Sequence, residues 1–308
     1  MTNTILAAID IGSHNCRLTI VKIRKQRSKV IHNFSYGTNL IKNLSYNNEF
    51  DDKNIKKTMQ CLQRFSKKLI EFEVKKYRCI ATEACRQVIN PEFFVNRVKE
   101  LTGISVEIIS SYEEAKLSLK SCTNYINKDN NEGIIFDIGG GSTELTYFNL
   151  EEQEFKTRSL SYGVINRSEK IQIYGEEFVK KEINNHFLSF KNNELKNVKK
   201  ELYAIGSCST ATTLCAIFQN LKRFDIKMIE GFSMKPFEMM KIAESIIRMD
   251  KEKLKMMPCV GSRYNLLLNG TLILIEILKT ILIRDLIVTQ KGLRDGILND
   301  LILQYEKN

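Results

Sequence analysis

One short pattern occurs twice in this chain of 308 residues, and it constrains the fold more than any other feature. An apolar run at residues 5–9 leads into the letters DIGS, which begin at Asp10, and a second run at residues 133–136 leads into DIGGGS, which begins at Asp137. In both copies, β-branched and aromatic residues alternate again after the turn, as they do in strands. The two aspartates are 127 positions apart, about the length of one domain. The simplest explanation is a duplicated domain.

The residues on either side of the repeated turn indicate what kind of loop it is. A P-loop requires Gly-Lys-Ser/Thr, which neither copy has. A Rossmann turn leads from a strand into a helix, whereas here a strand lies on both sides. Glycine allows close approach to the backbone, so the loop N–H groups can bind phosphate oxygens, and the preceding aspartate can hold a divalent cation. Either copy alone is also consistent with an ordinary hairpin, but the repetition favours phosphate binding.

Composition narrows the class of protein. Hydrophobic residues make up 43% and charged residues 27%, which is typical of a globular protein. The chain has 47 basic and 36 acidic residues, and a net charge of +11 attracts polyanions. Because the lysines are spread along the chain, as on solvated surfaces, we predict no dedicated nucleic-acid site.

Cysteine spacing and hydropathy indicate the compartment. The eight cysteines form no CxxC pair and no zinc-type cluster, which is typical of a reducing environment. The N-terminus lacks the basic region of a signal peptide. The most apolar stretch, residues 266–288, contains Glu276, Lys279 and Arg284, so it predicts a buried helix followed by a strand rather than a membrane span. We therefore expect a soluble, cytoplasmic protein with no membrane partner.

Strands and helices alternate in both halves, which predicts an α/β fold with a cleft between two domains. We expect the domains at residues 1–125 and 126–308, with the last helix as a candidate to pack back on the first domain. Apolar periodicity and end signals predict helices at residues 55–72, 91–101, 211–219 and 265–282.

Further residues suited to phosphate chemistry lie in the first loop and at three places outside the repeat. Glu113 and Glu114 fall in the first turn of a predicted helix, where the helix dipole alone can explain an acid, and at most one of them can face a cleft. Arg86, after a short strand, and Arg17 can each clamp a phosphate, although either can be a plain surface residue. The loop at residues 206–210 precedes a helix, so it is either an anion site or simple capping by Ser209 or Thr210.

Together these segments resemble the exopolyphosphatase and guanosine pentaphosphate phosphohydrolase (Ppx/GppA) family in its short, two-domain form. The resemblance covers almost the whole chain, in the segments AAIDIGSHNCRL, ATEACRQVIN, TGISVEIISSYEEAKLSL, FDIGGGSTEL, IGSCSTATTL and GLRDGIL. It implies two duplicated ribonuclease H-like domains of the superfold shared by actin, Hsp70 and sugar kinases. Its specific part is DIGGGSTEL joined to Glu-Glu-Ala about 23 residues earlier.

The resemblance also implies a function and a site. The function is Mg²⁺-dependent hydrolysis of terminal phosphoanhydride bonds, in inorganic polyphosphate or in pppGpp, which would give ppGpp. Glu114 would be the base, assisted by Glu144, and Asp137, together with Asp10, would hold Mg²⁺. The implied phosphate-binding residues are Gly12, Ser13, His14, Asn15, Arg17, Arg86, Gly139, Gly140, Gly141, Ser142, Thr143, Gly206, Ser207 and Arg263. A homodimer is expected from the relatives.

Three positions depart from the family pattern, namely Ser209, Asn265 and Gln290. Because of Asn265 and Gln290, a non-catalytic sensor of polyphosphate or of an alarmone is kept as an alternative. An ATP-dependent kinase of the same superfold is a further alternative, although a sugar kinase would need a substrate-binding aspartate in place of Glu-Glu-Ala at a helix start. The sequence does not choose between polyphosphate and pppGpp.

Overall fold

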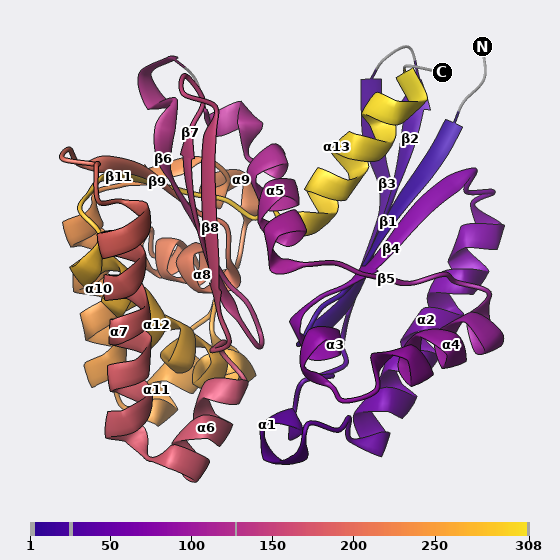
Figure 1. Cartoon of the computed structure of the whole chain (residues 1–308), viewed down its shortest axis with the longest axis horizontal. Coiled ribbons are helices and arrows are strands. Elements are labelled where there is room, and N and C mark those ends of the chain that lie inside the picture. The colour runs from indigo at the N-terminus through magenta and orange to yellow at the C-terminus, as the bar shows by residue number, and fades with distance from the viewer. Residues whose placement is uncertain (1–3, 25–26, 127, 307–308) are drawn as a thin grey trace. The chain divides into compact units, whose positions relative to one another are not determined.

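The computed structural model describes residues 4–24, 27–126 and 128–306, and its chain forms two compact units (Figure 1). The first unit comprises Met1–Ser121 and Leu293–Asn308, and the second comprises Cys122–Gly292. The C-terminal helix therefore groups with the first unit. The expected ranges, 1–125 and 126–308, placed it in the second half by sequence but named it as a candidate to pack back on the first domain.

The first unit is built on a five-stranded sheet with the order β3-β2-β1-β4-β5. The first three strands form an antiparallel meander, and β4 and β5 run parallel to β1. The strands are β1 (Thr4–Ile11), β2 (Asn15–Arg24), β3 (Arg27–Gly37), β4 (Lys76–Ala81) and β5 (Glu107–Ile108).

Helices cover both faces of this sheet. They are α1 (Leu44–Asn47), α2 (Asp52–Glu71), α3 (Glu83–Gln87), α4 (Pro91–Thr102), α5 (Ser111–Ser121) and α13 (Leu293–Glu306). Successive side chains of a strand point to opposite faces, and the Leu6 and Ala8 side chains pack with α13 and α5. The other face packs against α2, where the Tyr36 and Phe65 rings are in contact. Asp10 shares the face of Leu6 and Ala8, so its carboxylate lies on the α13 side.

The second unit repeats this arrangement. Its sheet order is β10-β11-β9-β6-β7-β8, so the run β8-β7-β6-β9-β11 has the same order and strand directions as β3-β2-β1-β4-β5. The strands are β6 (Glu132–Ile138), β7 (Thr143–Asn149), β8 (Glu154–Leu160), β9 (Leu202–Gly206), β10 (Phe232–Met234) and β11 (Ile283–Val288). The predicted duplicated α/β fold is confirmed.

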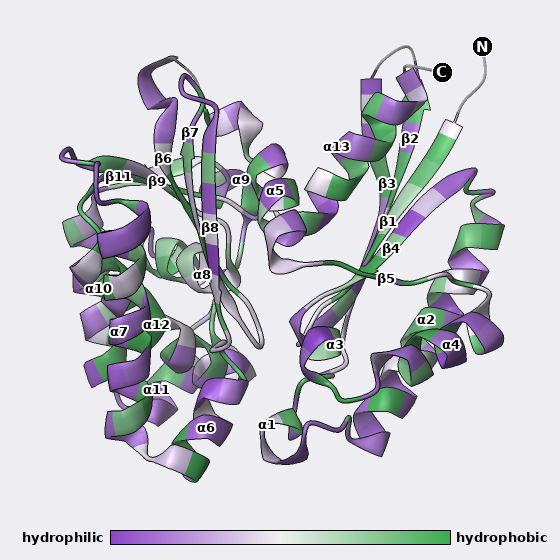
Figure 2. Ribbon diagram, viewed as in Figure 1, coloured by the Kyte–Doolittle hydropathy of each residue, from purple (hydrophilic) through white to green (hydrophobic). Residues whose placement is uncertain are grey.

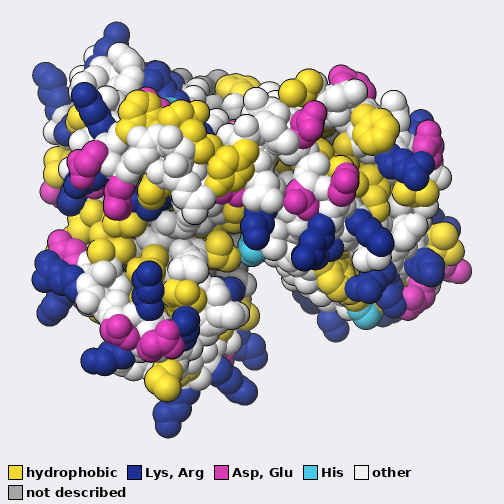
Figure 3. All heavy atoms as spheres, turned by 90° about the horizontal axis from the view of Figure 1, so that it is seen from below, with side chains coloured by type: hydrophobic (Ala, Val, Ile, Leu, Met, Phe, Trp, Pro, Cys, Tyr) yellow, Lys and Arg dark blue, Asp and Glu magenta, His cyan; other side chains and the backbone are white. Residues whose placement is uncertain are grey.

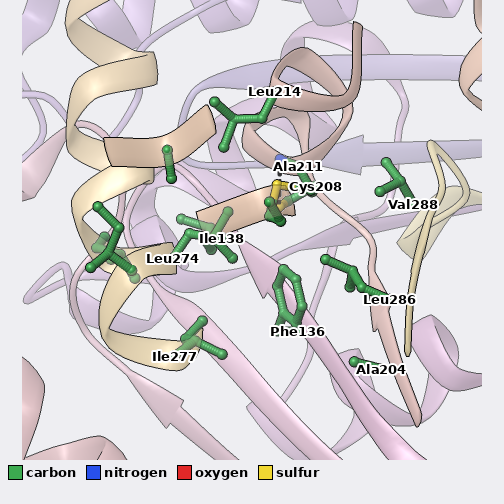
Figure 4. Packing of buried hydrophobic residues seen from close by; sticks show 14 of the residues in the cluster. Phe136, Ile138, Ala204, Cys208, Ala211, Leu214, Leu274, Ile277, Leu286 and Val288 are labelled. Atoms are coloured by element: carbon green, nitrogen blue, oxygen red, sulfur yellow. Dashed lines mark hydrogen bonds between the residues drawn. The ribbon is translucent and has the colours of Figure 1, made fainter. Parts of the chain in front are cut away.

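The helices of the second unit enclose a large apolar core. The α-helices are α6 (Asn166–Tyr174), α7 (Glu176–Glu194), α8 (Ser209–Phe218), α9 (Ile226–Ile229), α10 (Pro236–Arg248), α11 (Lys251–Met256) and α12 (Tyr264–Thr280). Short 3₁₀ turns are η1 (Thr123–Tyr125), η2 (Lys128–Asn130) and η3 (Gly261–Arg263). Phe136 and Ile138 of β6 lie in this core with Leu214 of α8 and Leu274 of α12 (Figure 4).

Hydropathy predicted these elements well. The four helices expected from periodicity begin and end within three residues of the observed α2, α4, α8 and α12. Figure 2 shows β1 as largely hydrophobic and the edge strand β8 as largely hydrophilic, in keeping with their places in the sheets. The apolar stretch at residues 266–288 forms α12 and β11, and among the described residues no helix is long and apolar enough to cross a membrane.

Candidate active site

The first glycine loop connects β1 to β2 through a tight turn. The Gly12 N–H donates to the Asn15 carbonyl oxygen at 3.0 Å, which closes the turn. Backbone N–H groups of the segment 38–41 donate to the carbonyl oxygens of Ser13 and His14 at 2.9 to 3.1 Å. The carbonyl groups of this loop are therefore held by a neighbouring backbone segment.

The second glycine loop repeats this turn between β6 and β7. The Gly139 N–H donates to the Ser142 carbonyl oxygen at 2.9 Å, and the carbonyl oxygens of Gly139 and Gly140 accept from the segment 164–165, also at 2.9 Å. Among the described residues, the N–H groups of Gly140, Gly141 and Ser142 have no hydrogen-bond acceptor. Three consecutive N–H groups without a protein partner can form an anion-binding nest. The Thr143 hydroxyl, by contrast, donates within the protein, to the Tyr162 carbonyl oxygen at 2.8 Å.

Two guanidinium groups lie around the aspartate of the first loop. Arg17 is directly opposite Asp10 on the neighbouring strand, and Arg294 approaches from α13. Arg294 donates to Thr19 Oγ1 at 2.9 Å and to Asn33 Oδ1 at 2.7 Å, which fixes its position over the sheet. Burial raises the pKa of the Asp10 carboxyl, and the charges of Arg17 and Arg294 oppose that rise.

The aspartate of the second loop has an acidic neighbour at the same register. Asp137 is directly opposite Glu144, so both carboxylates extend from one face of adjacent strands. Glu144 is buried and accepts a hydrogen bond from Ser159 Oγ at 2.9 Å. Within the described part of the chain, no three metal-ligating side chains gather at one point. Mg²⁺ is commonly held by one or two carboxylates, with water and phosphate oxygens as the other ligands, so this pair fits the ion better than Asp10 beside two arginines.

Glu114 and Arg86 are brought together in the first unit. The Arg86 guanidinium lies 2.9 Å from Glu114 Oε2 and also pairs with Glu83, and it donates to the Ile109 carbonyl oxygen at 2.9 Å. The Glu114 side chain is 14% exposed to solvent. Arg86 is therefore a partner of the candidate base, in addition to its predicted role on phosphate.

The neighbouring Glu113 has a different environment. It forms an ion pair with Arg78 at 2.6 Å and is the more exposed of the two acids. Its backbone N–H is capped by Ser110 Oγ at 3.2 Å. The two adjacent acids thus face different partners, as the sequence led us to expect.

The third loop lies at the end of β9. The Ser207 N–H donates to the Phe136 carbonyl oxygen at 3.0 Å, and its hydroxyl donates to the Lys291 carbonyl oxygen at 2.5 Å. Capping by Ser209 or Thr210 was wrong, because α8 begins at Ser209 and its N-cap is Cys208, whose Sγ accepts from the backbone of the first turn. The chain reaches the helix one residue earlier than the hydroxyl residues suggested.

Two further predicted residues have local partners. His14 Nδ1 lies 2.5 Å from Asn39 Oδ1, beside the first loop. Arg263 is exposed in η3 and donates to the Cys259 carbonyl oxygen at 3.2 Å, so in the described structure it contacts its own turn. Of the residues around the loops, our sequence reasoning missed Arg294, although the segment GLRDGIL that contains it was part of the resemblance.

This combination of a duplicated α/β fold and two glycine loops with carboxylates defines a class of phosphate-handling proteins. A model of the Ppx/GppA phosphatase family matches residues 19–305. The chain belongs to this family, and the resemblance noted in the sequence is confirmed.

Individual relatives agree with this assignment. The chain is 28% identical over 299 residues to a bifunctional 3-dehydroquinate synthase/phosphatase of Fusobacterium nucleatum, covering 90% of this chain but only 43% of that longer protein. It is 23% identical over 316 residues to exopolyphosphatase 2 of Mycobacterium tuberculosis, covering 96% and 98% of the two chains. These names are consistent with the expected type of enzyme.

Solved structures show the same fold. The Aquifex aeolicus family member superposes with a TM-score of 0.79 and 29% identity over 99% of both chains. An exopolyphosphatase from Cytophaga hutchinsonii has a TM-score of 0.85 at 18% identity, covering 98% of both chains, which shows the fold alone.

Proposed function

We propose that this protein is a Mg²⁺-dependent hydrolase that removes the terminal phosphate from a phosphoanhydride, either inorganic polyphosphate or pppGpp. The observation that carries the proposal is the second loop. Its N–H groups at Gly140, Gly141 and Ser142 have no acceptor among the described residues, and the carboxylates of Asp137 and Glu144 stand beside it. Donors for phosphate and oxygen ligands for a cation thus occur together.

The donor set fits a hard divalent cation. Asp137 is the proposed ligand, with Glu144 next to it, and the ion would neutralise charge on the phosphate oxygens as the bond breaks. Asp10 is the less suitable ligand, because the charges of Arg17 and Arg294 act on it. These two arginines are better suited to the polyanionic substrate itself.

In the proposed hydrolysis, Glu114 accepts a proton from the attacking water. The water oxygen forms a bond to the terminal phosphorus, the bridging P–O bond breaks, and the shortened anion leaves. Arg86 holds the Glu114 carboxylate through the 2.9 Å ion pair and so limits its rotation. Phosphoryl transfer depends mainly on positioning and on charge stabilisation, which is what these fixed groups supply.

Surface charge is compatible with a polyanionic substrate. In the face shown in Figure 3, Lys and Arg side chains are distributed over the surface, with Asp and Glu among them. The net charge of +11 still creates an overall attraction for polyanions. The homodimer implied by the resemblance and the cytoplasmic location expected from the cysteine and hydropathy patterns stay predictions.

The first test is phosphate release by the purified protein with Mg²⁺, using long-chain polyphosphate and pppGpp in parallel. We expect release from at least one substrate and its loss with EDTA. Glu114→Gln and Glu144→Gln should each lower turnover by about 10²-fold or more, the scale of a lost general base. Glu113→Gln is the matched control, because Glu113 pairs with Arg78 instead.

The alternatives predict other outcomes. A sensor would bind one of the two ligands without releasing phosphate, and Glu114→Gln would leave its binding unchanged. A kinase would turn over only when an acceptor is added. Wild-type rates in a folded Glu114→Gln variant would contradict the role of Glu114.

A further inference from the structure

A segment that our sequence reasoning did not single out lies directly behind the second glycine loop. This backing segment, residues 161–166, connects β8 to α6. At Gly163 it touches the loop backbone: a Cβ atom there would lie 2.5 Å from Gly140 C and Gly141 N, and 2.6 Å from Gly139 O. The two backbones are therefore in contact, with no room for a side chain between them.

The backing segment holds three successive carbonyl groups of the loop. Val164 N–H donates to Gly139 O and Ile165 N–H donates to Gly140 O, both at 2.9 Å. The third donor is a side chain: Asn166 Nδ2 donates to Gly141 O at 2.9 Å. The same carboxamide accepts from the Gly163 N–H at 2.7 Å and is fully buried, so it links the backing segment to the loop.

The planar peptide explains why these bonds matter for the opposite side of the loop. In a trans peptide, the C=O of one residue and the N–H of the next point in opposite directions. Fixing the carbonyl oxygens of Gly139, Gly140 and Gly141 therefore fixes the N–H groups of Gly140, Gly141 and Ser142. These are the three N–H groups without an acceptor among the described residues. Glycine-rich backbone adopts alternative conformations easily, so without these bonds a peptide can rotate and present a carbonyl oxygen to the anion.

We infer that Asn166 is a positioning residue for the phosphate-binding loop, one that keeps the Ser142 N–H directed at the bound phosphate. Two of the three carbonyl groups are held by backbone donors that substitution cannot remove. The third depends on the Asn166 side chain alone. The inference rests on the proposed function, since it assigns the loop a phosphate ligand.

The sharpest variant is Asn166→Asp, which changes one polar atom. One carboxylate oxygen of the aspartate can still accept from the Gly163 N–H. The other oxygen takes the place of the Asn166 Nδ2 donor and faces the Gly141 carbonyl oxygen, so two acceptors meet there. Asn166→Ala removes both of these bonds and also the bond from Asn166 Nδ2 to the Ser161 carbonyl oxygen at 3.3 Å. Ile183→Val is the matched control, because Ile183 is buried in the core of the same unit and the substitution has a small cost in stability.

Two measurements on the full chain test the inference. The first is hydrogen exchange of the peptide that covers residues 139–143, with and without inorganic tripolyphosphate. In the wild type we expect tripolyphosphate to slow this exchange, and in Asn166→Asp we expect faster exchange and little protection by the ligand. The second is phosphate release, where KM should rise about tenfold, the loss of one hydrogen bond to a charged group, and kcat should change much less. Glu114→Gln should do the opposite: its kcat should fall, and its KM should change much less.

The outcomes separate the inference from the proposed function. Suppose that the wild type hydrolyses a substrate and that Asn166→Asp is as stable as Ile183→Val. If Asn166→Asp then keeps the wild-type KM and the wild-type rate of hydrogen exchange, the inference is overturned while the function stands. If no substrate is hydrolysed but tripolyphosphate protects the loop only when Asn166 is present, the inference stands without the hydrolase. If tripolyphosphate neither protects the wild-type loop nor is bound, the phosphate loop and the inference both fall.

Discussion

The two glycine loops have the same backbone but opposite electrostatic surroundings. Each is closed by an N–H of its first glycine and a carbonyl three residues on, and each follows the first strand of a sheet with the same order. The residue opposite the aspartate differs: Arg17 faces Asp10, and Glu144 faces Asp137. The turn is the same in both copies, while the cross-strand position opposite the aspartate is basic in the first copy and acidic in the second. The difference indicates that the side chains beside Asp10 are suited to an anion, whereas the carboxylates of Asp137 and Glu144 are suited to a cation next to the phosphate-binding N–H groups of their loop.

The loops also differ in how they are supported. The carbonyl groups of the first are held by backbone N–H groups of the segment 38–41, and the His14 side chain contacts Asn39 Oδ1. The second is held by two backbone donors and by Asn166, with Gly163 in direct contact. Side-chain substitutions should therefore disturb the second loop more than the first.

The largest expected effect tests the electrostatic difference. Asp137→Asn should lower turnover by about 10²-fold, the scale of losing one electrostatic stabiliser of the transition state, and should raise the Mg²⁺ concentration needed for half-maximal rate. Asp10→Asn should leave that Mg²⁺ requirement nearly unchanged, because Asp10 already faces the charges of two arginines. The measurement is a Mg²⁺ titration of phosphate release. Equal shifts in the two variants would remove the distinction between the loops.

A second prediction compares the backbone supports. Gly163→Ala places a Cβ 2.5 Å from loop backbone atoms that cannot move aside easily, so it should lower the free energy of unfolding by about 3 kcal/mol. Gly12→Ala meets only one close atom, Asn15 O at 3.1 Å, and should cost about 1 kcal/mol or less. Urea denaturation measures both. Similar costs would show that Gly163 does not support its loop more tightly than the first loop is supported.

Local sequence patterns predicted most of the fold, because helices, strands and turns depend mainly on residues that are close together in the sequence. The strand–turn–strand repeat, the paired loops and the limits of α4 followed from period and end signals. The N-cap of α8 was missed, since a cysteine rarely caps and two hydroxyl residues follow it. Errors of this kind are of one to three residues at the helix ends.

The missed contacts of the candidate site join distant positions. Arg294 reaches Thr19 across 275 positions of sequence, and only the packing of α13 on β1 brings them together. Asn166 lies 25 positions from Gly141 and looks like an ordinary residue at a helix start. A single sequence shows no periodicity for such pairs, so their roles emerge only from the three-dimensional structure.

A third prediction tests the positive charge beside the first loop. Arg17→Met should raise KM for a polyanionic substrate about tenfold, because one charged hydrogen-bond donor is lost, and Arg17→Lys should recover part of the affinity. The effect should weaken as salt is added, since screening reduces the attraction. Arg97→Met is the control, because Arg97 is exposed and pairs with Glu100 within its own helix. An unchanged KM in Arg17→Met would mean that the first loop does not bind the anion through this residue.

The smallest expected effect concerns the stability of the second unit at acidic pH. His186 lies on α7 in that unit, and burial together with the charge of Arg158 lowers its pKa from 6.5 to about 4. Between these two values the unfolded chain binds a proton that the folded chain does not, so stability is retained above about pH 6.5 and lost as the pH falls toward 4.

Because the ring is only partly buried, we expect the loss to be roughly 1 kcal/mol. Thermal unfolding from pH 7 to 4.5 would measure it, alongside His186→Leu, which cannot take up the proton. The variant should lose less stability than the wild type over this range. Hydrogen exchange at pH 5 should place the difference in α7 and its neighbours in the second unit, and leave β1 and the first loop unchanged. If both proteins lost stability equally, the acid sensitivity would come from the carboxylates instead, and the two units would not differ in this respect.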